Sequence, residues 1–335
     1  MNQRCTRRRF LKTAALGTAV ATLAPGMLSG GPALQAAEDV SRVMLATHSR
    51  FADTNEQVNL NIARVLLEDA LQTFTNTTSI RDAWMRIFPN LQSSDVIGLK
   101  VNCINRRLSS HPEVTYAITE SVIAALDMNP NNLIIWDRTS RELQRARYNL
   151  NAGAKDVRCL ATSDGIGYDK GASIDIGNGK RVHLSTVLTE MCTYLINVPV
   201  LKDHSIAGVT LSLKNHYGSI DKPGRGHGSG GDPYIARLNA APAIREKTRL
   251  IVCDAAFGIY RGGPHGAPQW MNSQLLVGTD PVALDIIGAG LIDQQRRENG
   301  MAAASERAGY LRTAAALGLG IADEGRIEAM TMDLG

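Results

Sequence analysis

Short apolar runs alternate along this chain with longer segments in which apolar residues recur at helical spacing. The runs, rich in β-branched residues, are typical of buried strands and lie at 43–47, 95–102, 132–137, 194–201, 249–254, 275–278 and 327–332. The segments with helical spacing lie at 55–75, 79–88, 112–126, 237–247, 280–298 and 302–317. This alternation predicts an α/β fold, a three-layer sandwich with a mainly parallel β-sheet.

Two glycine-rich stretches interrupt the alternation. Residues 150–185 contain a predicted β-hairpin that turns at Gly177-Asn178-Gly179, and we expect this small hairpin to be an insertion beside the sheet. Residues 219–233 contain five glycines but lack the order of a phosphate-binding P-loop. They are predicted to form a flap over a ligand, and an ordinary loop is the alternative.

The stretch 194–218 carries the densest set of chemically useful side chains. A strand interrupted by Pro199 should end at Lys202 and His204, and a following segment, helix or strand, delivers Lys214, Asn215 and His216. Polar groups that follow the carboxyl ends of parallel strands line the ligand sites of open α/β sheets. The alternative is a solvated turn followed by the end of a surface helix.

Other polar residues should reach the same edge of the sheet. Lys100 lies inside an apolar strand, where a buried lysine needs a carboxylate or a ligand unless it extends to the surface. Asp137 ends the next strand, as a site residue or as the N-cap of a helix from Ser140. His111 precedes Pro112 at a helix start, where an anion can bind.

These residues together suit a small anionic or carbonyl-bearing molecule, because Lys and Asn bind anions and His or Asp move protons. The predicted catalytic residues are His204, Lys214 and Asp137. The predicted ligand-binding residues are Lys100, Asn102, His111, Lys202, Asn215, His216, Asp254, Gly263 and His265.

The segments 98–102, 111–114, 198–220 and 278–285 together resemble the bacterial and archaeal family called domain of unknown function 362. Members typically show Pro-x-Leu-Lys-x-His followed by Lys-Asn-x-x-Gly, as in VPVLKDHSIAGVTLSLKNHYGSI here. The resemblance supports the fold and the site but names no reaction. Some members carry ferredoxin-like cysteine clusters, which this chain lacks.

The N-terminus resembles a twin-arginine export signal. Arg7, Arg8 and Phe10 precede an apolar stretch too short and too rich in Gly and Pro for a stable membrane span. We expect residues 1–37 to be a signal peptide cleaved near Ala36 or Ala37, although an uncleaved anchor is the alternative. The twin-arginine translocation machinery is then a partner, and the periplasm the location, of a single domain spanning 38–335.

Charge and cysteine content narrow the function classes. Residues 1–37 contain five of the 36 basic residues and no acidic residue, which leaves 31 basic and 32 acidic residues. Such a nearly neutral chain gives no indication of a nucleic-acid partner. Cys103, Cys159, Cys192 and Cys253 are widely spaced in or beside apolar runs, so we expect free buried thiols rather than the two disulfides they could form.

Three functions remain open from the sequence. The first is an exported enzyme acting on a small organic anion by redox or isomerase chemistry, with or without a bound cofactor; the cofactor stays unknown. The second is a periplasmic binding or cofactor-handling protein without turnover. The third is a metal site that uses His204, His216 and a carboxylate, although the chain has no HExxH spacing. No Gly-x-Ser-x-Gly elbow indicates a serine hydrolase.

Overall fold

Ten strands form one sheet in the computed structural model, which describes residues 40–335. The order along the sheet is β12-β1-β11-β10-β7-β2-β3-β4, and β8 pairs with β10 and with β9. The strands are β1 Ser41–Thr47, β2 Ile97–Lys100, β3 Leu133–Asp137, β4 Arg158–Ala161, β7 Tyr194–Asn197, β8 Val200–His204, β9 Gly208–Thr210, β10 Thr248–Ile259, β11 Trp270–Gly278 and β12 Ile327–Asp333.

Most neighbouring strands of this sheet run in the same direction. The pairs β12–β1, β10–β7, β10–β8, β7–β2, β2–β3 and β3–β4 are parallel. Only β11, between β1 and β10, and β9, beside β8, form antiparallel pairs. The prediction of a mainly parallel sheet is therefore confirmed.

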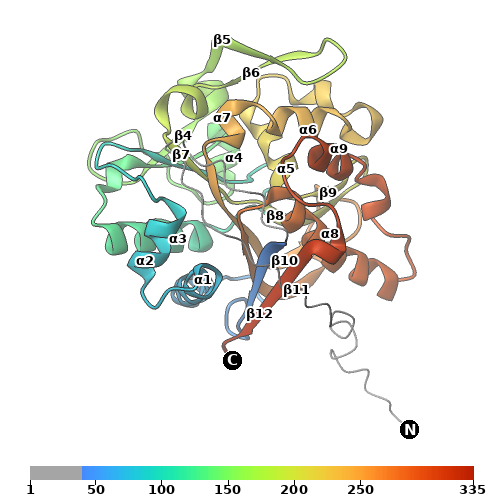
Figure 1. The fold of residues 1–335 in the computed structure, drawn as a ribbon, viewed down its shortest axis with the longest axis horizontal. Helices are drawn as coiled ribbons and strands as arrows, with labels where there is room; N and C mark the ends of the chain where they lie inside the picture. The colour runs from blue at the N-terminus through green and yellow to red at the C-terminus, as the bar shows by residue number, and fades with distance from the viewer. Residues whose placement is uncertain (1–39) are drawn as a thin grey trace, which may run out of the picture. The chain divides into compact units, whose positions relative to one another are not determined.

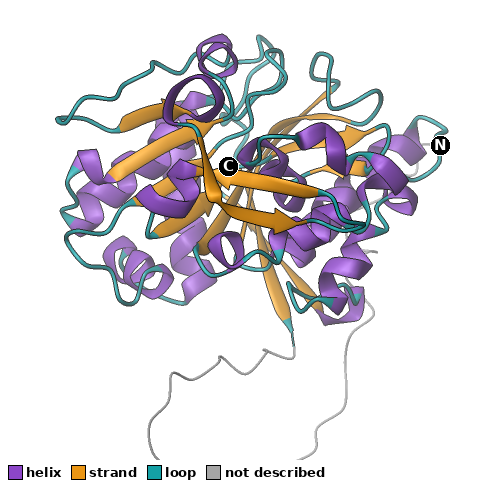
Figure 2. Ribbon diagram, turned by 90° about the horizontal axis from the view of Figure 1, so that it is seen from above, coloured by secondary structure: helices purple, strands orange, loops and turns teal. Residues whose placement is uncertain are grey.

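Helices cover both faces of the sheet (Figures 1 and 2). The helices are α1 Leu60–Thr75, α2 Ile80–Ile87, α3 Pro112–Leu126, α4 Ser140–Arg145, α5 Ser212–Asn215, α6 Tyr234–Asn239, α7 Pro242–Arg245, α8 Pro281–Glu298 and α9 Tyr310–Ala316. Successive residues of β3 point to opposite faces: Leu133 and Ile135 join the core beneath α1, α2 and α3, while Ile134 and Trp136 join the core beneath α5, α6, α8 and α9. The three-layer arrangement follows from this alternation.

The predicted elements agree with the structure best where the apolar pattern is long. Helix α3 has the predicted limits, because Pro112 starts it and Asp127 ends it in a left-handed conformation. The helix predicted over 302–317 is wrong in its first half, which holds only a short turn, Ser305–Arg307, before α9. The segment 237–247 is similarly divided into α6 and α7, because Pro242 begins a new helix.

The predicted insertion at 150–185 needs a correction. Its first part contains β4, which pairs with β3 and belongs to the main sheet. The hairpin itself is confirmed as β5 Tyr168–Asp175 and β6 Arg181–Ser185, a separate two-stranded sheet. Gly177 and Gly179 have positive φ angles in its turn, which other residues adopt at a cost.

Pro199 divides the central stretch into two strands. Strand β7 lies between β2 and β10, while β8 continues along β10 and ends at His204. The segment after it is both strand and helix, β9 and then α5. The buried carboxylate of Asp285 fixes the start of α5, since it accepts hydrogen bonds from the Ser212 and Leu213 amides at 2.7 and 3.1 Å.

Four sequence predictions concern features beyond the sheet. The four cysteines of the described residues are free and buried, as expected. No helix between residues 40 and 335 is long and apolar enough to cross a membrane. The export signal at 1–37 lies outside the described residues. Residues Asp39–Gly335 form one compact unit.

Candidate functional site

The sheet reverses its strand order between β2 and β7. From β2 the chain proceeds through β3 to β4 on one side, and it then returns to the other side of β2 as β7. In open α/β sheets, ligands bind at the carboxyl ends of strands beside such a reversal. Here Lys100 ends β2 and Asn197 ends β7.

Buried amide side chains fill this reversal point. Asn215 Nδ2 donates to the Lys100 carbonyl at 3.1 Å and to Asn197 Oδ1 at 2.7 Å. Asn102 Nδ2 donates to Asn215 Oδ1 at 3.0 Å, and Lys202 Nζ donates to Asn102 Oδ1 at 2.7 Å. The network ties β2, β7, β8 and α5 together. Asn102, Lys202 and Asn215 thus come together as predicted, but they use their polar groups on one another.

Lys100 is held by an internal ion pair. Its Nζ lies 2.7 Å from Asp137 Oδ1, and Asp137 Oδ2 accepts the Cys103 amide at 2.7 Å. Both side chains are buried, and an added Cβ at Gly218 would lie 2.6 Å from each of these charged groups. Asp137 does not cap α4, because Thr139 accepts the first-turn hydrogen bond there. Both carboxylate oxygens of Asp137 are therefore occupied by internal partners, whereas the predicted catalytic role requires one of them to reach a ligand.

His111 and His216 also have internal partners. Asp254 Oδ2 accepts the His111 amide and lies 2.7 Å from His111 Nδ1. The anion expected at the start of α3 is therefore the protein's own carboxylate. Burial lowers the pKa of His111, but the charge and hydrogen bond of Asp254 outweigh it, and the pKa is raised overall. His216 Nδ1 lies 3.1 Å from Ser219 Oγ, and burial, with the charge of Lys100, lowers its pKa to about 3.

A second group of side chains, His204, Lys214 and His227, lies beside this network; we call it the lysine–histidine cluster. Lys214 Nζ lies 3.5 Å from His227 Nε2, and the ring centroids of His204 and His227 are 5.8 Å apart. The ring of Tyr217 lies under Lys214 Nζ at 3.9 Å. Hence the two predicted catalytic residues His204 and Lys214 are neighbours, and His227 of the glycine-rich stretch joins them.

Hydrogen bonds fix which ring nitrogens carry protons in this cluster. His204 Nδ1 accepts the amides of Ile206 and Ala207, both at 3.1 Å, so the neutral ring carries its proton on Nε2. His227 Nδ1 donates to the Pro223 carbonyl at 3.1 Å, so its Nε2 is free to accept a proton from Lys214. The two rings therefore offer one donor and one acceptor.

Burial shifts the protonation equilibria of the cluster toward neutral forms. It lowers the pKa of Lys214 to about 7. Burial, followed by the nearby charge of Lys214, lowers the pKa of His204 to about 3, and the same two causes lower the pKa of His227. At neutral pH the histidines are uncharged and Lys214 exchanges its proton readily.

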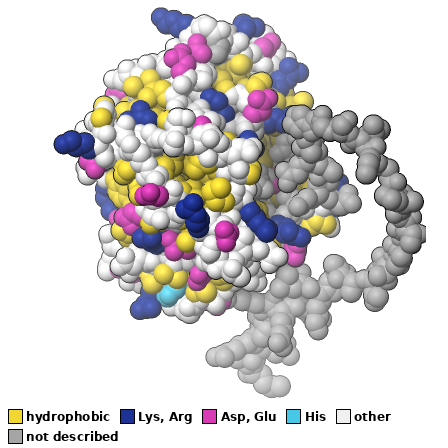
Figure 3. Space-filling model, turned by 60° about the vertical axis from the view of Figure 1, so that its left-hand side comes forward, with side chains coloured by type: hydrophobic (Ala, Val, Ile, Leu, Met, Phe, Trp, Pro, Cys, Tyr) yellow, Lys and Arg dark blue, Asp and Glu magenta, His cyan; other side chains and the backbone are white. Residues whose placement is uncertain are grey.

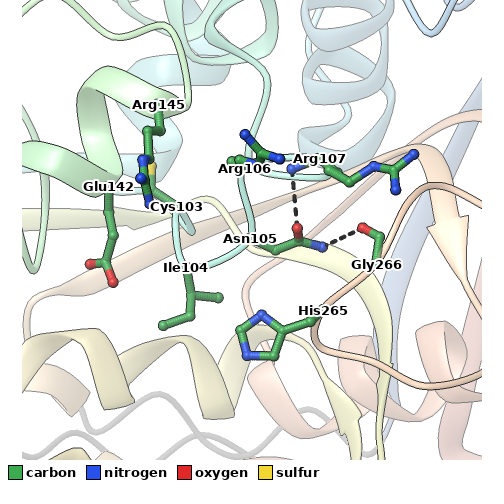
Figure 4. Close-up of a pocket in the computed structure, with 9 residues that line it drawn as sticks. All are labelled: Cys103, Ile104, Asn105, Arg106, Arg107, Glu142, Arg145, His265 and Gly266. Carbon is green, nitrogen blue, oxygen red and sulfur yellow. Dashed lines mark hydrogen bonds between the residues drawn. The ribbon is translucent and has the colours of Figure 1, made fainter.

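A cavity of about 310 Å³ opens at the carboxyl edge of the sheet (Figure 4). The residues that line it are Cys103, Ile104, Asn105, Arg106, Arg107, Glu142, Arg145, His265 and Gly266. We call it the arginine-lined pocket. Asn105 Nδ2 donates to the carbonyls of Pro264 and Gly266 at 3.0 and 2.9 Å, which joins the loop after β2 to the loop after β10.

The loop after β10 is fastened to the end of β8. The Gly263 amide donates to Asp203 Oδ1 at 2.6 Å, and the Ser205 amide donates to the Gly263 carbonyl at 3.1 Å. An added Cβ at Gly263 would lie 2.2 Å from the Asp203 carbonyl oxygen. Gly263, a predicted ligand-binding residue, is therefore needed for this close approach. His265 follows it, lines the pocket, and is one of the charges that lower the pKa of His204.

Sequence reasoning overlooked Arg145, Asn105 and His227 as site residues. Asn105 and Arg106 follow a predicted strand, and this position at a strand end could have indicated that they belong to the site. Arg145 ends a short helix, and only the tertiary structure brings it to the pocket. Within residues 40–335, no three His, Cys, Asp or Glu side chains gather as a metal site requires, and His204 and His216 have separate partners.

Comparison with known proteins identifies the family. The family model described as domain of unknown function (DUF362) matches residues 97–290, which is more than half of the chain. The chain belongs to the DUF362 family. The matched segment includes the lysine–histidine cluster and the arginine-lined pocket. No curated protein matches the sequence.

One solved structure also matches. It is a crystal structure of a Thermotoga maritima protein from a structural genomics consortium, with 9% sequence identity and a TM-score of 0.38. The alignment covers 68% of this chain and 59% of that chain, so this chain spans less than two thirds of the matched protein.

Proposed function

We propose that this DUF362 protein is an exported enzyme that acts on a small anionic organic molecule. The observation that carries the proposal is that the loop after β10 reaches both groups: His265 lines the arginine-lined pocket, and the Gly263 carbonyl accepts the amide of Ser205, which follows His204 of the lysine–histidine cluster. A ligand whose anionic group lies in the pocket would direct the rest of the molecule toward the cluster.

The charges of the pocket favour an anion. Arg106, Arg107 and Arg145 form no ion pair among residues 40–335, whereas the one acidic lining residue, Glu142, lies 3.0 Å from Arg138. Guanidinium groups bind carboxylate and phosphate oxygens in pairs, which suits either anion. On the face shown in Figure 3, by contrast, basic and acidic side chains are interspersed.

The cluster supplies groups suited to proton transfer. Neutral His204 can donate from Nε2, and Lys214, whose pKa lies at about 7, can accept or release a proton near neutral pH. General acid–base catalysis is most efficient when the pKa of the catalytic group lies near the working pH. The buried amide network would hold β2, β8 and α5 in place during the reaction.

Ligand binding by arginine variants tests this proposal. A panel of small carboxylates and phosphate esters is screened for compounds that raise the melting temperature, and their affinities are measured by calorimetry. We expect Arg145→Gln to weaken the best ligand at least about tenfold, or about 1.4 kcal/mol. Arg141→Gln on the same helix α4 is the control, because Arg141 does not line the pocket.

The anion site would be contradicted if both substitutions weakened ligand binding equally, or if no compound of the panel bound to the protein. A ligand that binds at the pocket without being converted, even with candidate cofactors added, would instead favour a periplasmic binding protein, the second function.

A further inference from the structure

We propose that Lys214 is a nucleophile that forms an imine with the carbonyl group of a small oxo acid or anionic aldehyde. The inference rests on the proposed function and names its substrate class. It assigns the carbonyl carbon to Lys214 Nζ and the anionic group of the substrate to the arginine-lined pocket, because the loop after β10 is bonded both to Asn105 of the pocket and to the end of β8 beside the cluster.

Lys214 differs from the other buried lysines of the described chain in its partners. Lys100 contacts the Asp137 carboxylate at 2.7 Å, and Lys202 donates to Asn102 Oδ1 and the Leu108 carbonyl at 2.7 and 3.0 Å. Lys214 is 6% exposed, yet its ammonium has only the His227 ring nitrogen at 3.5 Å and the face of Tyr217. A lysine without an oxygen partner in a desolvated site readily becomes the neutral amine that attacks carbonyl groups.

The backbone on both sides of Lys214 is held firmly. Asp285 accepts the Ser212 and Leu213 amides, and Asn239 Nδ2 donates to the Leu213 carbonyl at 2.8 Å. On the other side, the Asn215 side chain is fixed in the amide network. A nucleophile must be held within a narrow range of positions, and these contacts provide that restraint.

The glycine-rich stretch forms a roof over the amine. His227 lies between two short turns, Pro223–Gly226 and Gly228–Gly231, and the Tyr217 hydroxyl donates to the Gly226 carbonyl. This roof excludes water from Lys214, which favours imine formation over hydrolysis. It also carries the base, His227 Nε2, to the amine.

The proposed reaction balances without an oxidant or a reductant. The Lys214 ammonium transfers one proton to His227 Nε2, and the resulting amine lone pair attacks the carbonyl carbon. A proton then moves from nitrogen to the former carbonyl oxygen, giving a carbinolamine. His227 returns its proton to the departing hydroxyl, which leaves as water, and the product is the protonated imine of Lys214.

Reductive trapping tests the proposal directly. The purified protein is incubated with pyruvate, or with the longer oxo acid levulinate, and with sodium cyanoborohydride near pH 7, and the modified lysine is located by peptide mass spectrometry. We expect one stoichiometric adduct on Lys214, with Lys202 and Lys247 unmodified. Lys214→Arg keeps the charge and should reduce labelling at this position at least tenfold, whereas Lys222→Arg, on the exposed part of the glycine-rich stretch, should leave it unchanged.

The outcomes separate this inference from the proposed function. Unlabelled Lys214 in a wild-type protein that binds pyruvate through Arg145 overturns the imine and leaves the anion pocket intact. Uniform labelling of surface lysines also overturns it. Failure of both labelling and anion binding rejects the two proposals together. Because the wild-type protein alone shows which lysine is modified, the test does not depend on the folding of the Lys214 variant.

Discussion

At the residue scale, the three buried lysines of residues 40–335 show three ways of removing an ammonium from water. Lys100 forms an ion pair, Lys202 donates to two oxygen atoms, and Lys214 has a ring nitrogen and an aromatic face. The sequence marks all three as unusual because they lie beside apolar residues. Only their partners distinguish a structural lysine from one that is available for chemistry.

The stability of a Lys214→Met variant should depend on pH. Burial lowers the pKa of Lys214 from 10.5 to about 7, so the unfolded chain binds more protons between these values. Folding is therefore penalised most at pH 7 and below, and the penalty fades as the pH rises toward 10.5. We expect the methionine to raise the free energy of unfolding by about 1–3 kcal/mol at pH 7, with little gain at pH 10.

Urea unfolding at pH 7 and pH 10 measures this difference in the free energy of unfolding. A stabilisation by methionine that is the same at both pH values would contradict the lowered pKa of Lys214 as its cause. Lys202→Met is the matched comparison. It removes the donor for Asn102 Oδ1 and the Leu108 carbonyl, both buried, at a cost of about 1–3 kcal/mol. Because burial also lowers the pKa of Lys202, to about 8, this cost offsets a similar pH-dependent gain, and Lys202→Met should be less stable than Lys214→Met at pH 7.

At the element scale, the segment that follows α5 passes directly over the Lys100–Asp137 ion pair. Gly218 lies at the contact, where a Cβ would stand 2.6 Å from Lys100 Nζ and Asp137 Oδ1. The lysine cannot withdraw freely, because its Nζ also donates to the Val101 carbonyl at 2.7 Å. A glycine is therefore required here by close approach of the backbone to a buried charge pair.

Gly218→Ala should lower the free energy of unfolding by about 1–3 kcal/mol, because overpacking displaces the ion pair. Gly224→Ala, on the neighbouring turn, meets no atom within 4 Å and should change stability by less than about 0.5 kcal/mol. Chemical denaturation of the two variants gives the comparison. Similar effects from both substitutions would show that the contact at Gly218 relaxes easily.

At the scale of the whole molecule, the proposed export has a consequence for folding. The twin-arginine route is typical of proteins that fold before they cross the membrane. The four described cysteines are free and buried, so the folded domain does not depend on disulfides formed after export. A site assembled from β2, β8, α5 and the loop after β10 would then be complete before export.

Replacing Arg7 and Arg8 by lysine should retain the precursor in the cytoplasm, because the receptor of this route reads the arginine pair. Cell fractionation with immunoblotting measures the distribution, and a substitution of Arg4 serves as the control. Unchanged periplasmic protein after the double substitution would contradict the assignment of the signal.

The sequence by itself determined the layers of this protein and the edge of the sheet at which its candidate site lies. Short apolar runs rich in β-branched residues are typical of strands buried on both faces, and Pro112 fits the first turn of α3 through its own fixed φ angle. Since parallel strands end at one edge, the sequence predicts that Asn102, Asp137, Lys202 and Asp254 converge there, without knowledge of the strand order.

Only the tertiary structure decided which of these side chains have polar groups left to contact a ligand. Lys202 meets Asn102 across 100 residues, and the Asn105 side chain meets the Gly266 carbonyl across 161. Such partners depend on the strand order and on loop paths, which no local pattern encodes. For that physical reason the sequence predicted Lys100, Lys202 and Lys214 all to face a ligand, whereas the structure gives Lys100 and Lys202 internal oxygen partners and brings His227 and Arg145 to the candidate site.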